Sequence, residues 1–123
     1  MVNKLSRDAD ISIEKITKIE KLYHADGYKH VLLVLINLQK KFKHDKNGSD
    51  VSALDIIDYF KIYTKGLYGL MSRVVLETWG IYTTDDIGTI VDLLCKYKII
   101  SKNKNDKSSQ FHNVYDFSIF EDY

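Results

Sequence analysis

The hydrophobic pattern is clearest in the middle of the chain. Between Tyr28 and Phe42 apolar side chains recur at helical spacing, and further apolar residues fill the opposite side. A helix that is apolar nearly all round normally lies inside a domain. Asp26 is a suitable N-cap, and Lys40, Lys41 and Lys43 favour the negative end of the helix dipole. The pattern therefore predicts a central helix that begins near Asp26.

A thinner pattern precedes this helix. Ile13, Ile16, Ile19 and Tyr23 have the spacing of one helical face, which predicts a short helix over residues 11–23. Residues 1–10 are polar and charged, so we expect them to form a lead-in to one domain that spans residues 11–123.

Capping residues mark two helix starts later in the chain. Ser52 is followed three residues on by Asp55, in the manner of a capping box, and we expect this helix to stop at Gly66. Thr83 is followed by Asp85 and Asp86, whose carboxylates favour the positive end of a helix dipole. These signals predict helices from Ser52 and from Thr83.

A further helix is predicted over residues 67–79. Its apolar residues are expected to line one side, whereas Arg73 and Glu77 stand four apart on the other side and can pair. Gly80 is suitably placed to end the helix in a left-handed conformation. The apolar residues of the expected buried side are Leu67, Leu70, Met71, Val74 and Val75.

The pattern changes after the helix that starts at Thr83. Residues 98–102 resemble a strand, residues 103–110 a polar turn, and residues 111–119 a returning strand. The predicted fold class is therefore mainly α with a C-terminal β-hairpin (α+β), with five helices before the hairpin. Helix, connector, helix and hairpin in this order also suggest a winged helix-turn-helix in the second half.

The residues from Leu67 onward resemble a known family. The resemblance rests on Gly69–Met71, Val75–Ile81 and Thr83–Val91, and later on Phe111 and Val114–Phe117. These stretches are similar to the bacterial Minf-type group of uncharacterised proteins. The resemblance implies a shared fold and brings no known activity with it.

Composition restricts the functions to consider. The 18 basic and 17 acidic residues give a net charge of +1, which offers no overall attraction to nucleic acid or to an anionic membrane. The single cysteine excludes an intramolecular disulfide, and no apolar run approaches membrane-spanning length. We expect a cytoplasmic protein without a membrane segment.

Chemical motifs are absent from the sequence. The histidines His24, His30, His44 and His112 never pair closely with a second type of metal ligand, and Cys95 lies in a helix with a strong apolar face. No glycine-rich phosphate loop or recognisable nucleophile motif is present. We therefore predict no metal, no cofactor and no enzymatic activity.

Aromatic residues near the C-terminus give a candidate surface for a protein partner or a second copy. Exposed aromatic side chains are typical of such surfaces, although a hairpin lying across the helices would bury them instead. The candidate residues are Trp79, Tyr82, Phe111, Tyr115 and Phe117.

Lysine clusters at residues 40–46 and 98–107 give a second hypothesis, an RNA- or ribosome-associated protein or a winged-helix-like nucleic-acid-binding protein. Asp85, Asp86 and Asp92 oppose duplex binding, because they lie on the helix that would approach the phosphates. The favoured prediction is a noncatalytic interaction or adaptor module. The candidate nucleic-acid contacts are Lys40, Lys41, Lys43, Lys102, Lys104 and Lys107.

Overall fold

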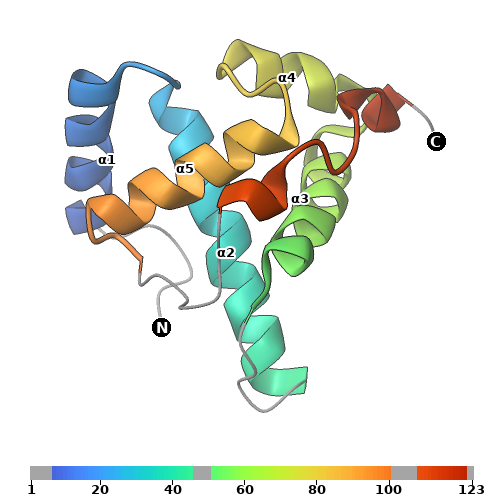
Figure 1. The fold of residues 1–123 in the computed structure, drawn as a ribbon, viewed down its shortest axis with the longest axis horizontal. Coiled ribbons are helices and arrows are strands. Elements are labelled where there is room, and N and C mark those ends of the chain that lie inside the picture. Colours follow the sequence, from blue (N-terminus) through green and yellow to red (C-terminus); the bar gives the residue numbers. More distant parts are fainter. Residues whose placement is uncertain (1–6, 46–50, 101–107, 122–123) are drawn as a thin grey trace.

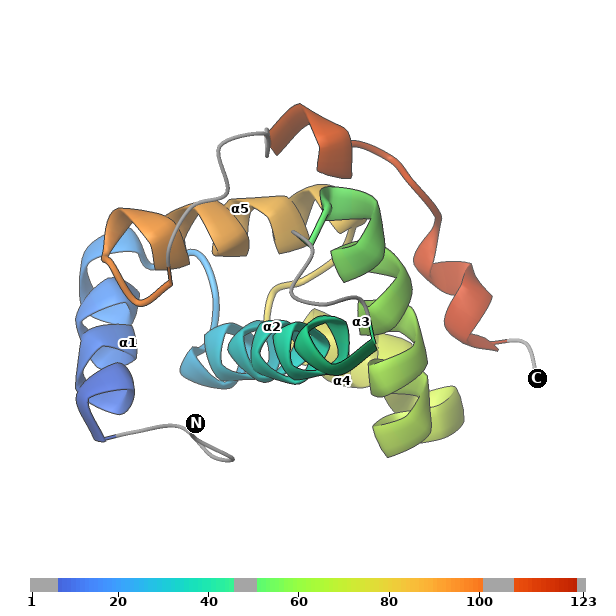
Figure 2. The ribbon, with the colours of Figure 1, turned by 90° about the horizontal axis from the view of Figure 1, so that it is seen from below.

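The computed structural model of the protein describes residues 7–45, 51–100 and 108–121. Helices α2 (Ala25–Asp45) and α5 (Thr84–Lys96) cross at the centre, with α1 (Arg7–Glu20) at one end and α3 (Ala53–Tyr68) at the other (Figures 1 and 2). A short helix, α4 (Ser72–Thr78), lies beside α3. Single turns of 3₁₀ helix follow as η1 (Gly69–Met71), η2 (Ser108–Phe111) and η3 (Phe117–Glu121).

The predicted central helix is confirmed as α2. Its side chains at Tyr28, Val31 and Val34 are fully buried, and the helix packs against α1, α3 and α5. The chain enters α2 after Lys21, whose φ of 54° ends α1 in the left-handed region. Helix α1 itself begins at Arg7, inside the predicted lead-in.

The predicted capping box at Ser52 and the predicted cap at Thr83 are both present. The hydroxyl of Ser52 accepts a hydrogen bond from the Asp55 amide, and the Asp55 carboxylate accepts one from the Ser52 amide. Thr83 and Asp86 exchange the equivalent pair at the start of α5. Gly80 has a φ of 89° directly after α4, as its position predicted.

The predicted fold class is wrong in two places: the helix end at Gly66 and the C-terminal β-hairpin. Helix α3 continues through this glycine to Tyr68 and turns through η1 directly into α4. Gly66 does not have the positive φ of a glycine that ends a helix. The turn occurs instead at Gly69, whose φ of 54° suits glycine.

The second error is the C-terminal β-hairpin, because the described residues contain no strand. Lys98 has a φ of 61°, and the amides of Ile99 and Ile100 both donate to the Leu94 carbonyl. Residues 98–100 therefore fold back on the end of α5, and their amides are not free for a β-ladder. Without a hairpin, the predicted winged helix-turn-helix is wrong as well.

The C-terminal segment runs along the outer side of α5 and α3 (Figure 2). Its turn η2 packs against both helices, and η3 packs against η1 and α4. Local bonds hold its backbone, since the Ser118 amide donates to the Asp116 carboxylate and the Ile119 amide to the Asp116 carbonyl. The segment is a cover over the helices rather than a returning strand.

Candidate functional site

The aromatic residues predicted as a partner surface are in different environments. Phe111 and Phe117 are only 2% exposed, and Phe111 lies against Gly88 of α5. The Tyr115 hydroxyl donates to the Ile57 carbonyl at 2.9 Å, and burial raises the pKa of this phenol. Of the five residues, Tyr82 alone has a largely exposed side chain. These residues therefore do not form one exposed aromatic surface.

Trp79, the remaining member of that set, belongs to an aromatic cluster around His30. The imidazole of His30 is buried, and its ring centroid lies 5.2 Å from that of Trp79 and 5.4 Å from that of Phe60. Tyr63 and Tyr68 complete the cluster at 5.5 and 6.0 Å. Burial among these rings lowers the pKa of His30 to about 4, so the imidazole is neutral at pH 7.

A short polar chain links this cluster to the turn between α3 and α4. Nε2 of His30 is 2.8 Å from the Thr64 hydroxyl, and the Thr64 carbonyl accepts a hydrogen bond from the Ser72 hydroxyl. The same Ser72 hydroxyl also reaches the Gly69 carbonyl at 2.7 Å. Because His30, Thr64 and Ser72 are all buried, the turn rests on a fixed support.

Four large apolar side chains project from this turn into solvent. Leu67, Leu70, Met71 and Val74 are each between 50% and 57% exposed. We call these four residues the apolar corner. They were predicted to line the buried side of a helix, whereas Leu76 and Ser72 take that side in α4. Apolar residues crowd this stretch at several helical angles, so the sequence alone did not show which of them face inward.

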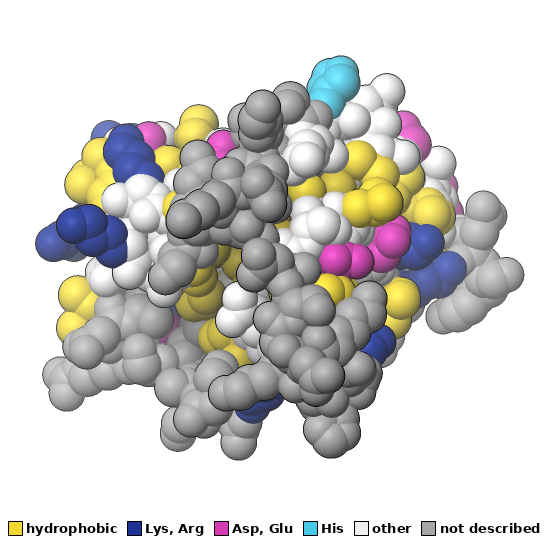
Figure 3. Space-filling view, turned by 60° about the horizontal axis from the view of Figure 1, so that its bottom comes forward, with side chains coloured by type: hydrophobic (Ala, Val, Ile, Leu, Met, Phe, Trp, Pro, Cys, Tyr) yellow, Lys and Arg dark blue, Asp and Glu magenta, His cyan; other side chains and the backbone are white. Residues whose placement is uncertain are grey.

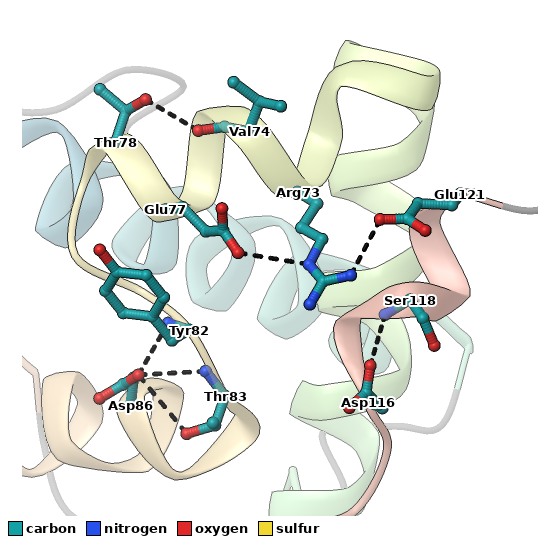
Figure 4. A network of polar contacts seen from close by, with 10 residues as sticks. All are labelled: Arg73, Val74, Glu77, Thr78, Tyr82, Thr83, Asp86, Asp116, Ser118 and Glu121. Carbon is teal, nitrogen blue, oxygen red and sulfur yellow. Dashed lines mark hydrogen bonds and ion pairs between the residues drawn. The ribbon is translucent and has the colours of Figure 1, made fainter.

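Charged residues lie along one edge of the apolar corner, where η3 packs against η1 and α4. Figure 4 shows Arg73 and Glu77 on the side of α4 opposite Val74. Arg73 donates to Glu77 through Nε at 3.3 Å and to Glu121 of η3 through Nη1 at 2.9 Å. The arginine also lowers the pKa of the nearby Asp116, although the hydrogen bonds from Ser118 contribute more. Three carboxylates against one guanidinium leave this edge net negative.

The predicted nucleic-acid contacts are described only in part. Lys40 and Lys41 lie near the end of α2, and the ammonium group of Lys41 is 5.9 Å from the centre of the Tyr59 ring. The Lys43 side chain and all of Lys102, Lys104 and Lys107 lie outside the described residues. On the face shown in Figure 3, the coloured Lys and Arg side chains are scattered among acidic and hydrophobic ones.

The remaining polar groups serve mainly to hold elements together. Asp86 accepts hydrogen bonds from the amides of Tyr82 and Thr83 and from the Tyr23 hydroxyl. At the start of α5, Asp85 lies 3.0 Å from Nδ1 of His112. Within the described part of the chain, no group of three His, Cys, Asp or Glu side chains has a metal-binding arrangement.

Comparisons with known proteins give no relative for this chain. No protein family, curated protein or solved structure matches the chain. The resemblance to the Minf-type group therefore stays a prediction. No helix in the described ranges combines the length and the apolar content needed to cross a bilayer.

Proposed function

We propose that this chain is a noncatalytic protein-interaction module that docks a partner on the apolar corner. The observation that carries the proposal is the exposure of four large apolar side chains within eight consecutive residues, Leu67, Leu70, Met71 and Val74, each at 50% or more. A cluster of this kind with polar residues at its edge is typical of a protein-binding surface. Single exposed apolar residues need no such explanation.

The support beneath the corner strengthens the proposal. Ser72 and Leu76 are fully buried under it, and Ser72 bonds to the carbonyls of Thr64 and Gly69. A surface that is already ordered loses little conformational entropy when a partner binds. The corner is therefore preorganised for docking.

Site-specific photo-crosslinking in a lysate of the source cells tests the proposal. A photoreactive amino acid in place of Met71 is expected to give a defined protein adduct, and Leu70→Asp in the same chain should abolish that adduct. Leu54 is the matched control position, because its side chain is 58% exposed but it lies in the first turn of α3, away from the corner.

Two outcomes would contradict the proposal. One is an identical set of adducts from the Met71 and Leu54 positions, which would indicate nonspecific contact. The other is an adduct that contains nucleic acid and disappears after nuclease treatment, which would favour the RNA-associated alternative. Circular dichroism should show an unchanged helical spectrum for Leu70→Asp, since the side chain is half exposed.

A further inference from the structure

Helix α1 carries a second apolar stripe that faces solvent. Its inner side chains, Ile13 and Ile16, are fully buried against the rest of the domain. Ile11 lies on the other side of the helix and is 53% exposed, and Ile19, which was predicted to share the face of Ile13 and Ile16, is 59% exposed. Leu22, just after the helix, is 55% exposed. A helix at a domain surface needs one apolar face to pack, so this outer stripe is not required by the fold.

Lysines surround this stripe. Lys15, Lys18 and Lys21 are all exposed, and helical spacing places Lys15 and Lys18 beside Ile11 and Ile19. Glu14 is exposed on the same helix, so the described outer surface of α1 is net positive. We call Ile11, Lys15, Lys18, Ile19 and Leu22 together the basic stripe.

Two other acidic side chains of α1, Asp10 and Glu20, contact α2 and the end of α5. Asp10 lies 3.7 Å from the ammonium of Lys29. Glu20 accepts hydrogen bonds from the Tyr97 hydroxyl at 2.9 Å and from Lys96 at 3.1 Å. These carboxylates are engaged at the inner edges of the helix, so they do little to offset the lysines on the outside.

The basic stripe and the apolar corner are complementary. Each presents large apolar side chains that are about half exposed, and the stripe is edged by ammonium groups where the corner is edged by the carboxylates of Glu77, Glu121 and Asp116. Opposite charges at the rim of an apolar contact fix the register of that contact and speed the association of the two molecules. The stripe is thus a partner of suitable chemistry for the corner.

The two surfaces cannot meet within one molecule. Helix α1 lies at one end of the domain and α4 beside α3 at the other, as both ribbon views show (Figures 1 and 2). We propose that the basic stripe of one copy docks on the apolar corner of another, so that copies associate head to tail. This inference rests on the proposed function, because it assigns the occupant of the same corner.

A head-to-tail contact has definite consequences for assembly. Each bound pair keeps one free corner and one free stripe, so further copies can add until the chain of subunits closes or stops. Four side chains on one surface and five on the other make a small contact, and small contacts are weak and transient. We therefore expect a weak association, with a dissociation constant of up to about 1 mM.

Sedimentation equilibrium of the purified chain between about 10 µM and 1 mM tests the proposal. The wild type should show a rising average mass, and Leu70→Asp or Ile19→Asp should each weaken association at least tenfold. Leu54→Asp is the matched control and should associate like the wild type, because Leu54 belongs to neither surface. Raising the salt concentration should weaken the wild-type association, since charges edge the contact.

Mixing the two defective variants is the decisive step. The Leu70→Asp chain keeps an intact stripe and the Ile19→Asp chain an intact corner, so the mixture should form one-to-one dimers and nothing larger. A wild type that remains monomeric to 1 mM would overturn the proposal, and so would mixed variants that remain monomeric. If the purified chain stays monomeric but Met71 crosslinks to a different protein in lysate, the head-to-tail contact fails while the proposed function stands. If Met71 also gives no adduct in lysate, both proposals fail.

Discussion

Gly88 sets how closely the C-terminal segment approaches α5. A Cβ atom at this position would lie 2.8 Å from both Cβ and Cγ of Phe111, which is closer than carbon atoms can pack. Either the Phe111 ring or the whole η2 turn would have to move. We therefore expect Gly88→Ala to destabilise the protein, although alanine is the better helix former.

The magnitude follows from two opposing effects. Replacing a helical glycine with alanine stabilises a helix by about 1 kcal/mol, whereas overpacking a close contact costs about 1–3 kcal/mol. The net expectation for Gly88→Ala is a loss of about 1 kcal/mol in the free energy of unfolding. Gly66→Ala is the matched control, because a Cβ there meets nothing within 4 Å and α3 continues through it, so that variant should gain up to about 1 kcal/mol.

Urea unfolding followed by circular dichroism measures both variants. The two substitutions should shift the midpoint in opposite directions, and a midpoint for Gly88→Ala as high as that for Gly66→Ala would refute the reasoning. A Phe111→Ala background provides a further check. With the ring removed, Gly88→Ala should no longer destabilise, because its penalty comes from that one contact.

Three further predictions concern buried or bonded polar groups. The folded-state pKa of His30, about 4, lies below the ordinary value of 6.5, so its neutral form contributes stability that is present above pH 6.5 and lost as the pH falls through 4. Between pH 7.5 and 4.5 the wild type should lose about 2 kcal/mol more than His30→Gln in urea unfolding, and equal losses would contradict the assignment. Asp86→Ala should lower the free energy of unfolding by about 1–2 kcal/mol through the lost cap, whereas the exposed Asp92→Ala should change it by less than about 0.5 kcal/mol. Tyr115→Phe should cost about 1 kcal/mol by removing the hydrogen bond from the hydroxyl to the Ile57 carbonyl, and an unchanged thermal midpoint would show that this bond contributes nothing.

The helices were predictable wherever one local signal determined the outcome. The capping boxes at Ser52 and Thr83 and the apolar run of α2 are encoded by residues within a few positions of one another. The hairpin was not predictable in this way. Residues 98–100 contain Ile99 and Ile100, as a strand would, but their amides bond back to Leu94 after a left-handed turn.

The candidate site was harder to predict than the helices, because it depends on tertiary packing. Phe111 and Phe117 are residue types typical of an interface, yet they are buried where the C-terminal segment packs against the helices. Leu70 and Met71 are residue types typical of a core, yet their side chains are half exposed because η1 turns the chain at Gly69. Neither outcome follows from hydrophobicity alone, since the same side chains suit both environments.

The covering segment at the C-terminal end also bears on how the protein folds during synthesis. Helices α3 and α5 emerge from the ribosome before residues 108–121, which supply Phe111, Phe117 and Phe120 to the core. At about 5–20 residues per second, the apolar side chains that these phenylalanines cover stay exposed for a few seconds during synthesis. Exposed apolar surface of this kind favours aggregation until η2 packs against α3 and α5.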